Sequence, residues 1–199
     1  MLLSAKAEVN LPSPADGRTA LHHAAGGGAD VGVVAVLLFA KAAVNSRTRD
    51  GRTPLHCVVT RRNDVECGRV IDMLVYAGAD INAVTSAGET VLQTAAVHES
   101  LELVHTLLAQ QPSVDLNARS PSDGTTALMA TCAANMRSIS NASVSIISDL
   151  VKAKAQVNTG NTDTGMTPLI AAVHMQRPEV VELLLKARAN VEARTIAGE

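Results

Sequence analysis

The 199-residue chain has almost no aromatic residues, with one phenylalanine, one tyrosine and no tryptophan. Proteins that hold single-stranded nucleic acid usually stack its bases on aromatic rings, so this scarcity argues against such a platform. The net charge is only −2, from 17 basic and 19 acidic residues, and offers no broad field for nucleic acid or an anionic membrane. We therefore expect neither nucleic acid nor a membrane among its partners.

Long apolar runs and a secretory leader are also missing. A membrane span needs about 20 apolar residues, whereas the longest apolar run, Val33 to Ala40, has only the length of a short helix. The first residues, Met1 to Lys6, lack the basic and hydrophobic segments of a secretory signal. An odd number of cysteines, three, without framework spacing fits a reducing compartment. These features predict an intracellular protein, in the cytoplasm or the nucleus.

What the chain does contain is a short phrase that returns five times, with its glycines at positions 17, 51, 88, 124 and 165. The second copy runs from Asp50 to His56 and reads Asp-Gly-Arg-Thr-Pro-Leu-His. A second phrase, rich in leucine and alanine, closes each unit, as from Leu37 to Asn45, and ends in Asn in all copies but the last, which ends at Glu192. Self-similarity at this period is typical of stacked repeats rather than of one globular core.

Each unit predicts a turn and two short helices. The glycine allows the positive φ that a tight turn needs, and the threonine two residues later is a natural helix N-cap. Apolar residues then recur at helical spacing, as at Leu55, Val58 and Val59. A second helix follows a loop, with start signals such as Ser100 and Pro178. Neither helix is long enough to bury its apolar stripe alone, so each unit needs its neighbours.

The opening Gly-Xaa-Thr-Pro-Leu-His and the closing Leu-Leu-…-Gly-Ala-Asp-Val-Asn strongly resemble the ankyrin repeat, over essentially the whole chain. The resemblance implies an all-α ankyrin-repeat solenoid of helix-turn-helix units joined by β-turn or hairpin loops. We expect a single array over 1–199, made of a partial unit 1–15, units of about 16–49, 50–86, 87–122, 123–163 and 164–196, and a truncated unit 197–199. Since the chain opens and stops inside units, we also expect a longer array around it.

Two departures from the ankyrin pattern carry predictions. Only Gly78 fills the left-handed position after the second helix; Lys6, Lys41, Lys154 and Arg188 stand at the equivalent places, and we expect them to adopt positive φ. Extra residues fall between the paired helices of the second and fourth units, which predicts enlarged loops over Arg61 to Gly68 and Asn135 to Ser145.

The residues that could carry chemistry favour structural roles. By resemblance, His22 and His56 tie a helix to neighbouring backbone, and their spacing gives no metal-ligand pair. Cys57 and Cys132 are expected to be small buried hydrophobes, while Cys67, in the enlarged loop, is the best candidate for a reactive thiol. The glycines 26 to 28 lack the strand and the Lys-Ser/Thr of a phosphate loop. We expect no catalysis, no cofactor and no metal.

Binding is the function that the pattern favours. The resemblance implies a concave strip formed by turn tips and the exposed side of the first helices. On this chain the candidate positions are Arg18, Arg49, Arg52, Thr60, Arg61, Glu89, Val97, His98, Thr125, Met166, His174 and Met175, with Arg47, Arg119 and Arg194 on turn arms. Arginine is frequent in the first half of the strip, which leads to the hypothesis of a basic surface for an acidic partner.

These inferences together predict a monomeric protein–protein interaction module, with a partner that the sequence does not identify. One alternative remains open, namely a regulatory or substrate-recruiting segment of a larger enzyme such as a kinase or a ubiquitin ligase. In that case the catalytic activity would lie in another domain.

Overall fold

The computed structural model describes residues 8–27, 31–59, 66–110, 113–134 and 141–198. These residues contain ten α-helices and divide into two compact units, 1–87 and 88–199. Unit 1 contains α1 (Ala20–Gly26), α2 (Val31–Phe39), α3 (Pro54–Val58) and α4 (Cys67–Tyr76). Unit 2 contains α5 (Val91–Val97), α6 (Leu101–Ala109), α7 (Ala127–Ala133), α8 (Asn141–Lys152), α9 (Pro168–His174) and α10 (Pro178–Lys186).

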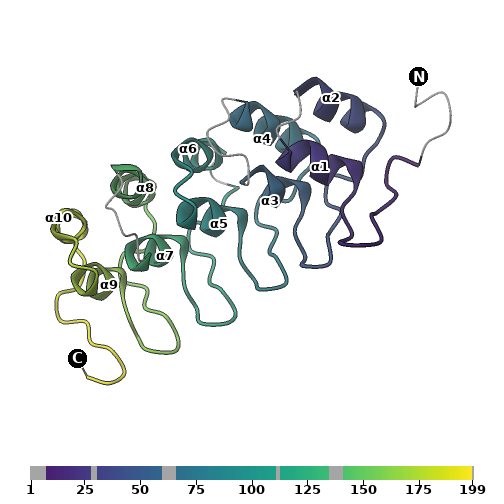
Figure 1. Cartoon of the computed structure of the whole chain (residues 1–199). Coiled ribbons are helices and arrows are strands. Elements are labelled where there is room, and N and C mark those ends of the chain that lie inside the picture. Colours follow the sequence, from purple (N-terminus) through teal and green to yellow (C-terminus); the bar gives the residue numbers. More distant parts are fainter. Residues whose placement is uncertain (1–7, 28–30, 60–65, 111–112, 135–140, 199) are drawn as a thin grey trace. The chain divides into compact units, whose positions relative to one another are not determined.

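Each unit stacks pairs of helices in two rows. In unit 1, α1 packs against α3 and α2 packs against α4 (Figure 1). In unit 2, α5, α7 and α9 form one row while α6, α8 and α10 form the other, and long turns project from the row of first helices (Figure 1). The predicted all-α repeat architecture is confirmed. None of the described helices combines the length and the apolar character that a membrane crossing requires.

The alanine-rich composition has a direct use in the first helices. Ala25 in α1, Ala95 in α5 and Ala171 in α9 are completely buried. The distance between two packed helices depends on the side chains between them, so alanine lets consecutive first helices lie close together. The larger core side chains are aliphatic, and those that are fully buried include Leu21, Leu55, Ile71 and Leu74 in unit 1 and Leu107, Leu128, Ile146, Ile147, Leu150 and Leu184 in unit 2.

A threonine caps every first helix, as predicted. The N-cap residues are Thr19, Thr53, Thr90, Thr126 and Thr167. In α5 the hydroxyl of Thr90 accepts a hydrogen bond from the N–H of Gln93 at 3.2 Å, so one of the unpaired donors of the first turn is satisfied. The side-chain oxygen of Gln93 accepts a hydrogen bond from the N–H of Thr90 at 2.7 Å, which completes a reciprocal capping box.

The repeated glycine is required by two independent constraints. Gly51 has φ of 76°, a left-handed conformation that costs any residue with a Cβ. A Cβ at this position would also lie 2.5 Å from the backbone nitrogen of Ser86, in the following turn. That same N–H donates to the carbonyl oxygen of Asp50 at 2.9 Å. Glycine therefore allows neighbouring turns to approach closely enough to form a hydrogen bond.

The asparagine that closes a repeat forms hydrogen bonds with the next repeat of the same compact unit. The side chain of Asn45 accepts a hydrogen bond from the N–H of Asp80 at 2.8 Å and donates to the carbonyl oxygen of Gly78 at 2.9 Å. In unit 2, Asn158 accepts from the N–H of Asn190 at 2.8 Å in the same manner. The closing phrase thus keeps an asparagine because its amide bridges the ends of consecutive second helices.

Three second helices, α2, α8 and α10, end in Schellman caps whose left-handed residue is a lysine or an arginine. Lys41, Lys154 and Arg188 have φ of 64°, 69° and 64°, so the predicted left-handed conformation is confirmed at all three. At the end of α2 the N–H of Ala42 donates to the carbonyl oxygen of Leu37, and the N–H of Lys41 donates to that of Leu38, both at 3.0 Å. The equivalent prediction for residue 6 lies outside the described residues.

Two first helices end in the same way, which the sequence did not predict. Glu99 after α5 and Gln176 after α9 have φ of 55° and 52°. Their N–H groups donate to the carbonyl oxygens of Ala96 and Val173 at 3.1 and 2.9 Å. The second helix of each of these units begins only one or two residues later, so a sharp cap is what allows the loop to be short.

The expected limits of the two enlarged loops were too wide. Cys67 and Gly68 already belong to α4, and α8 begins at Asn141, so residues 141 to 145 are helical rather than loop. Ser and Asn are common in loops, but the apolar residues Val144, Ile146 and Ile147 give this stretch a helical stripe of its own. The intervening residues 60–65 and 135–140 lie outside the described part of the chain.

A buried arginine of the fifth repeat, Arg177, bonds to both helices of the fourth repeat. The C-cap residue of α7, Ala134, has φ of −57° and ψ of 118°, so α7 lacks the left-handed cap of α5 and α9. Arg177, only 4% exposed, donates to the carbonyl oxygen of Thr131 in α7 at 2.9 Å and to the hydroxyl of Ser143 in α8 at 2.5 Å. A cation that caps the carbonyls of a helix C-terminus is favourable, so Arg177 holds α7 and α8 together.

Replacing the left-handed lysines by glycine is expected to stabilise the protein. A side chain at φ above 60° costs roughly 1 kcal/mol. Gly78 occupies the equivalent position in the second repeat, and no atom lies within 4 Å of a Cβ built on it. We predict that Lys41→Gly and Lys154→Gly each raise the free energy of unfolding by about 0.5–1 kcal/mol in urea titrations. The controls Lys41→Ala and Lys154→Ala keep the Cβ and are expected to give no such gain; equal gains in the alanine variants would contradict the explanation.

Removal of the Arg177 side chain is expected to destabilise the fourth repeat strongly. Arg177→Met removes both hydrogen bonds that Arg177 donates, to the carbonyl of Thr131 and to the hydroxyl of Ser143, which should cost about 2–4 kcal/mol. Ser143→Ala removes only one of the two bonds and should cost about 1 kcal/mol. Urea unfolding monitored by circular dichroism measures both; a change below about 0.5 kcal/mol for Arg177→Met would show that this side chain does not join the helices.

Candidate functional site

The candidate binding residues lie at two kinds of place in the structure. Arg18, Arg52, Glu89, Thr125 and Met166 each follow the turn glycine, one residue before the N-cap of a first helix. Those of the first-helix ends are exposed and close α5 or α9, namely Val97, His98, His174 and Met175. Thr60 and Arg61 lie outside the described residues.

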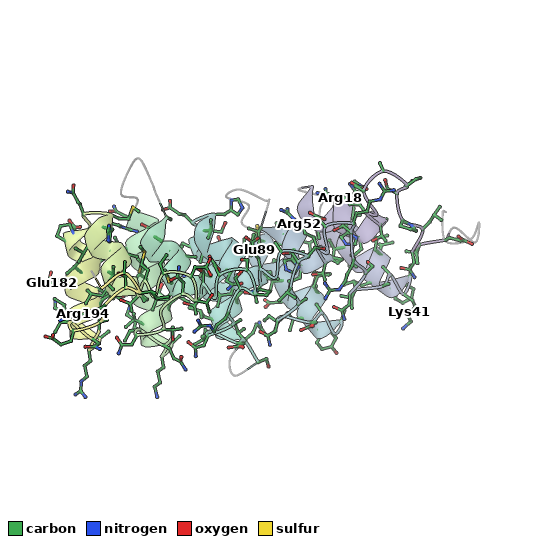
Figure 2. The ribbon with its side chains drawn as sticks, turned by 90° about the horizontal axis from the view of Figure 1, so that it is seen from below. Arg18, Lys41, Arg52, Glu89, Glu182 and Arg194 are labelled. Carbon is green, nitrogen blue, oxygen red and sulfur yellow. The ribbon has the colours of Figure 1, made fainter. Side chains whose placement is uncertain are left out.

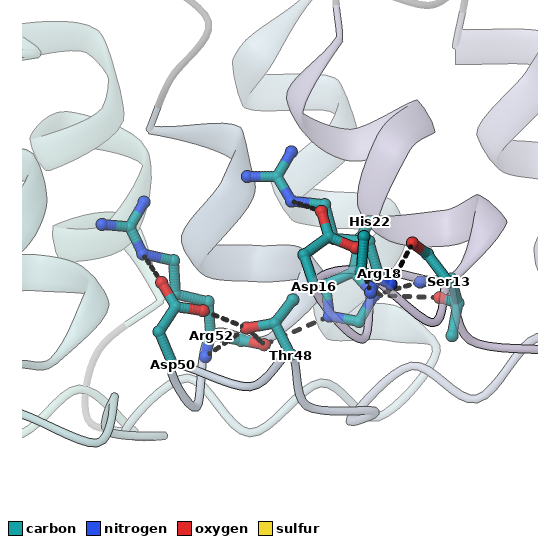
Figure 3. A network of polar contacts seen from close by, with 9 residues as sticks. Ser13, Asp16, Arg18, His22, Thr48, Asp50 and Arg52 are labelled. Atoms are coloured by element: carbon teal, nitrogen blue, oxygen red, sulfur yellow. Dashed lines mark hydrogen bonds and ion pairs between the residues drawn. The ribbon is translucent and has the colours of Figure 1, made fainter.

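In unit 1 the turn arginines pair with aspartates of their own turns. The guanidinium of Arg18 lies 3.4 Å from the carboxylate of Asp16, and that of Arg52 lies 2.9 Å from Asp50. Figure 3 shows the two pairs side by side in consecutive turns. A hydrogen bond from the hydroxyl of Thr48 holds the pKa of Asp50 below its usual value, so the carboxylate stays charged. The positive charge of each arginine is therefore locally compensated.

The arginines on the turn arms make structural contacts with backbone. Arg49 donates to the carbonyl oxygen of Pro14 at 2.5 Å, in the preceding turn. Arg47 donates to the carbonyl oxygens of Gly51 at 3.1 Å and Val84 at 2.6 Å. In unit 2, Arg119 donates to the carbonyl oxygen of Gly160 at 3.0 Å. These guanidinium groups brace neighbouring turns, while Arg194 in the last turn is exposed.

The turn face of unit 1 is consequently less basic than the sequence suggested. Arg18 and Arg52 extend on the same side of the unit, opposite Lys41 (Figure 2). Their charges are opposed by Asp16 and Asp50, which the hypothesis of a basic strip did not count. The two arm arginines retain their charge but are anchored through backbone carbonyls. The basic strip remains a hypothesis, with half of its guanidiniums already paired.

In unit 2 the structure brings four candidate residues together around one cleft. The cleft has a volume of about 220 Å³ and is formed by α5, α7 and the turn before α7. The four candidates in its lining are Glu89, Val97, His98 and Thr125. The other lining residues, which the sequence did not single out, are Gln93, Thr94, Ser120, Ser122, Asp123 and Ala130. Met166, His174 and Met175 lie outside this cleft.

The carboxylate of Asp123 is held in place at the wall of the cleft. It accepts hydrogen bonds from the N–H of Thr125 at 3.0 Å and from its hydroxyl at 2.7 Å. Partial burial acts to raise the pKa of Asp123, but these hydrogen bonds outweigh it and the pKa lies below the usual value. The hydroxyls of Ser120 and Ser122, 2.7 Å apart, lie in the same turn. The cleft therefore presents a fixed negative charge.

The histidines of the repeated phrase serve the scaffold, as the resemblance implied. The Nδ1 atom of His22 accepts the N–H of Thr19 at 3.1 Å, so its Nε2 carries the proton and donates to the carbonyl oxygen of Arg52 at 3.1 Å. Gln93 replaces this histidine in the third repeat and donates to the carbonyl oxygen of Thr125 at 2.8 Å. One side chain thus caps its own helix and binds the next turn.

The expectation of a reactive thiol at Cys67 is wrong. Cys67 is the first residue of α4 and only 3% exposed, because the helix starts earlier than the loop composition suggested. Cys57 and Cys132 are buried, as predicted, and burial raises the pKa of the Cys132 thiol to about 12. No described group of three or more His, Cys, Asp or Glu side chains is arranged to hold a metal ion.

Comparison with known proteins identifies the fold family. The family model described as ankyrin repeats, in three copies, matches residues 1–83, 65–140 and 114–195. The chain belongs to the ankyrin-repeat family. The solved structure of the ankyrin repeat domain of Bcl-3, a member of the IkappaB protein family, superimposes with a TM-score of 0.78 at 27% identity. That match covers 92% of this chain and 78% of the Bcl-3 chain.

Two curated relatives of these ankyrin repeats belong to the same group. The mouse B-cell lymphoma 3 protein homolog is 31% identical over 150 residues, which are 74% of this chain and 31% of the relative. The NF-kappa-B p105 subunit of Gallus gallus is 29% identical over 156 residues, 78% of this chain and 15% of the relative. The chain thus spans less than a third of either relative. Like the IkappaB-like ankyrin domains, it is a protein-binding module.

Acidification is expected to destabilise the ankyrin repeats through His22. Burial lowers the pKa of His22 from its usual 6.5 because it disfavours the charged ring, although the hydrogen bond to the carbonyl oxygen of Arg52 acts to raise it. Below pH 6.5 the unfolded chain binds this proton more readily, so stability is full above that pH and falls as pH drops toward the folded-state pKa. We predict that His22→Gln, which copies Gln93, removes up to about 1.4 kcal/mol per pH unit from that slope.

Urea titrations of the wild-type protein and His22→Gln between pH 5 and 7.5 measure this effect. The two proteins should have similar stability at pH 7.5, because Gln93 makes the equivalent bonds in the third repeat. An unchanged slope in the variant would show that other groups cause the loss of stability in acid.

Proposed function

We propose that this ankyrin-repeat module binds a segment of a protein partner through its turn tips and the cleft of unit 2. The observation that carries the proposal is the cleft itself, because it gathers Glu89, Val97, His98 and Thr125 from two repeats. Val97 is 43% exposed at the end of α5, although apolar residues at this helix are otherwise buried. An exposed apolar side chain beside anchored polar groups is typical of a protein-binding surface.

NF-kappa-B is the first partner to test. The relatives include an NF-kappa-B subunit and a Bcl-3 homolog, and the Bcl-3 structure belongs to the IkappaB family. The likeness covers 78% and 74% of this chain, so it includes the repeats that form the cleft. We further propose that the module acts as a monomer, without catalytic activity of its own and without binding nucleic acid, inside the cell.

A pair of valine substitutions tests the surface. Val97→Lys places a long charged side chain at the cleft, whereas Val191→Lys makes the same change at a valine that is 65% exposed and outside the cleft. With immobilised protein and purified NF-kappa-B subunits, we expect Val97→Lys to weaken binding at least about tenfold and Val191→Lys to leave it within about twofold. Circular dichroism checks that both variants fold.

Two outcomes would contradict this proposal. If wild-type protein does not bind NF-kappa-B, the choice of partner is wrong, and the same pair of variants is then applied to a partner captured from a lysate. If a bound partner is lost equally with both variants, or with neither, the cleft of unit 2 is not part of the binding surface.

A further inference from the structure

The residue between the turn glycine and the N-cap threonine differs in charge from one repeat to the next. In the first two repeats it is arginine, and Arg52 lies 2.9 Å from the carboxylate of Asp50, two residues before it. The fourth repeat keeps the aspartate, Asp123, but has Thr125 in place of the arginine. The threonine supplies two hydrogen bonds and no charge. The Asp–Arg ion pair of the unit 1 turns is therefore replaced, in this turn of unit 2, by a hydrogen bond between Asp123 and Thr125.

A second carboxylate strengthens this negative charge at the cleft. The third repeat has Glu89 at the arginine position, and Glu89 and Asp123 both line the cleft. No lysine or arginine occurs among the lining residues, which all lie in the described part of unit 2. Arg119, on the arm of the same turn as Asp123, directs its guanidinium to the carbonyl oxygen of Gly160. Glu89 and Asp123 therefore place two carboxylates in the lining of one small cleft.

The dimensions of the cleft indicate the size of its occupant. A volume of about 220 Å³ is below the range of about 300–1,000 Å³ typical of drug-sized ligands. A single long side chain is a better match than a whole ligand. The wall also offers the hydroxyls of Ser120 and Ser122 as acceptors and Val97 as an apolar surface for a methylene stem.

We propose that the cleft between α5 and α7 receives a lysine or arginine side chain from the bound segment of the protein partner. The carboxylates of Glu89 and Asp123 would face the cationic end of that side chain, and Val97 would contact its apolar stem. This proposal rests on the proposed protein-binding function and specifies the chemistry of the partner. It replaces the acidic partner that the basic-strip hypothesis favours with a basic one at this site.

The charge requirement can be tested with matched short peptides. The probes are two Gly/Ser hexapeptides that differ at one position, arginine in the first and its neutral isostere citrulline in the second. In ¹H–¹⁵N spectra of the whole chain we expect the arginine peptide to shift amide signals of residues 89–98 and 120–125, with an effect that decreases with added salt. Equal shifts with the citrulline peptide, or no localised shift with either, would overturn the proposal.

A variant that copies the first two repeats provides the matched test on the protein. Thr125→Arg recreates the Asp-Gly-Arg arrangement of Asp50 to Arg52, so its guanidinium should pair with Asp123 and compensate the charge from within the chain. We expect binding of the arginine peptide to fall at least tenfold. The reciprocal variant Arg52→Thr changes a turn outside the cleft and should leave that binding unchanged.

The partner itself distinguishes the failure of this proposal from the failure of the proposed function. If the partner binds Thr125→Arg as tightly as the wild-type protein, the cation site is wrong and the protein-binding function stands. If Thr125→Arg weakens the partner at least tenfold while circular dichroism reports an unchanged fold, the cation site is supported. Should no protein partner bind even the wild-type chain, the proposed function fails, and the peptide experiment alone decides the charge preference of the cleft.

Discussion

The N–H of one turn and the carbonyl oxygen of the turn before it form the hydrogen bond on which the stacking of turns depends. In unit 1 the N–H of Arg49 donates to Asp16 at 2.9 Å, and in unit 2 that of Thr162 donates to Asp123 at 2.7 Å. The bond requires close approach, which only glycine allows at the adjacent position. Where Pro121 removes the donor in unit 2, its ring instead occupies the space beside Gly88. The repeated phrase therefore contains the glycine that backbone contact between consecutive turns requires.

The residues that hold consecutive repeats together differ from those whose side chains can vary to bind a partner. Backbone groups, the capping threonine and the His or Gln after it hold consecutive repeats together. The residue between glycine and threonine contributes its carbonyl oxygen to that scaffold, so its side chain is free to vary. Because Arg52 and Thr125 both offer the same carbonyl, an exchange of side chain at this position changes the charge without a change in the bond from the preceding repeat to that carbonyl.

The sequence allowed the helices, the caps and the left-handed lysines to be predicted, because each depends on local rules that repeat. Thr90, Lys41 and Gly51 could be assigned from their positions in the phrase alone. The start of α8 and the role of Arg177 could not, since both depend on contacts between residues 34 and 46 positions apart. The Asp–Arg pairs are visible in the sequence as two opposite charges on either side of a turn glycine. That spacing brings the two side chains together in a turn, although it would not in a helix.

The same comparison explains why the candidate site arises where it does. The third residue of the helix is histidine in α1 and glutamine in α5, each of which binds the following turn, but it is Met129 in α7 and Ile170 in α9. Gln93 thus binds the carbonyl oxygen of Thr125, while the hydroxyl of Thr125 binds the carboxylate of Asp123. Thr125 therefore contacts both Gln93, which joins consecutive repeats, and Asp123, whose repeat has no arginine at the position of Arg52. The anionic cleft is therefore preorganised by the scaffold, which lowers the ordering cost of binding.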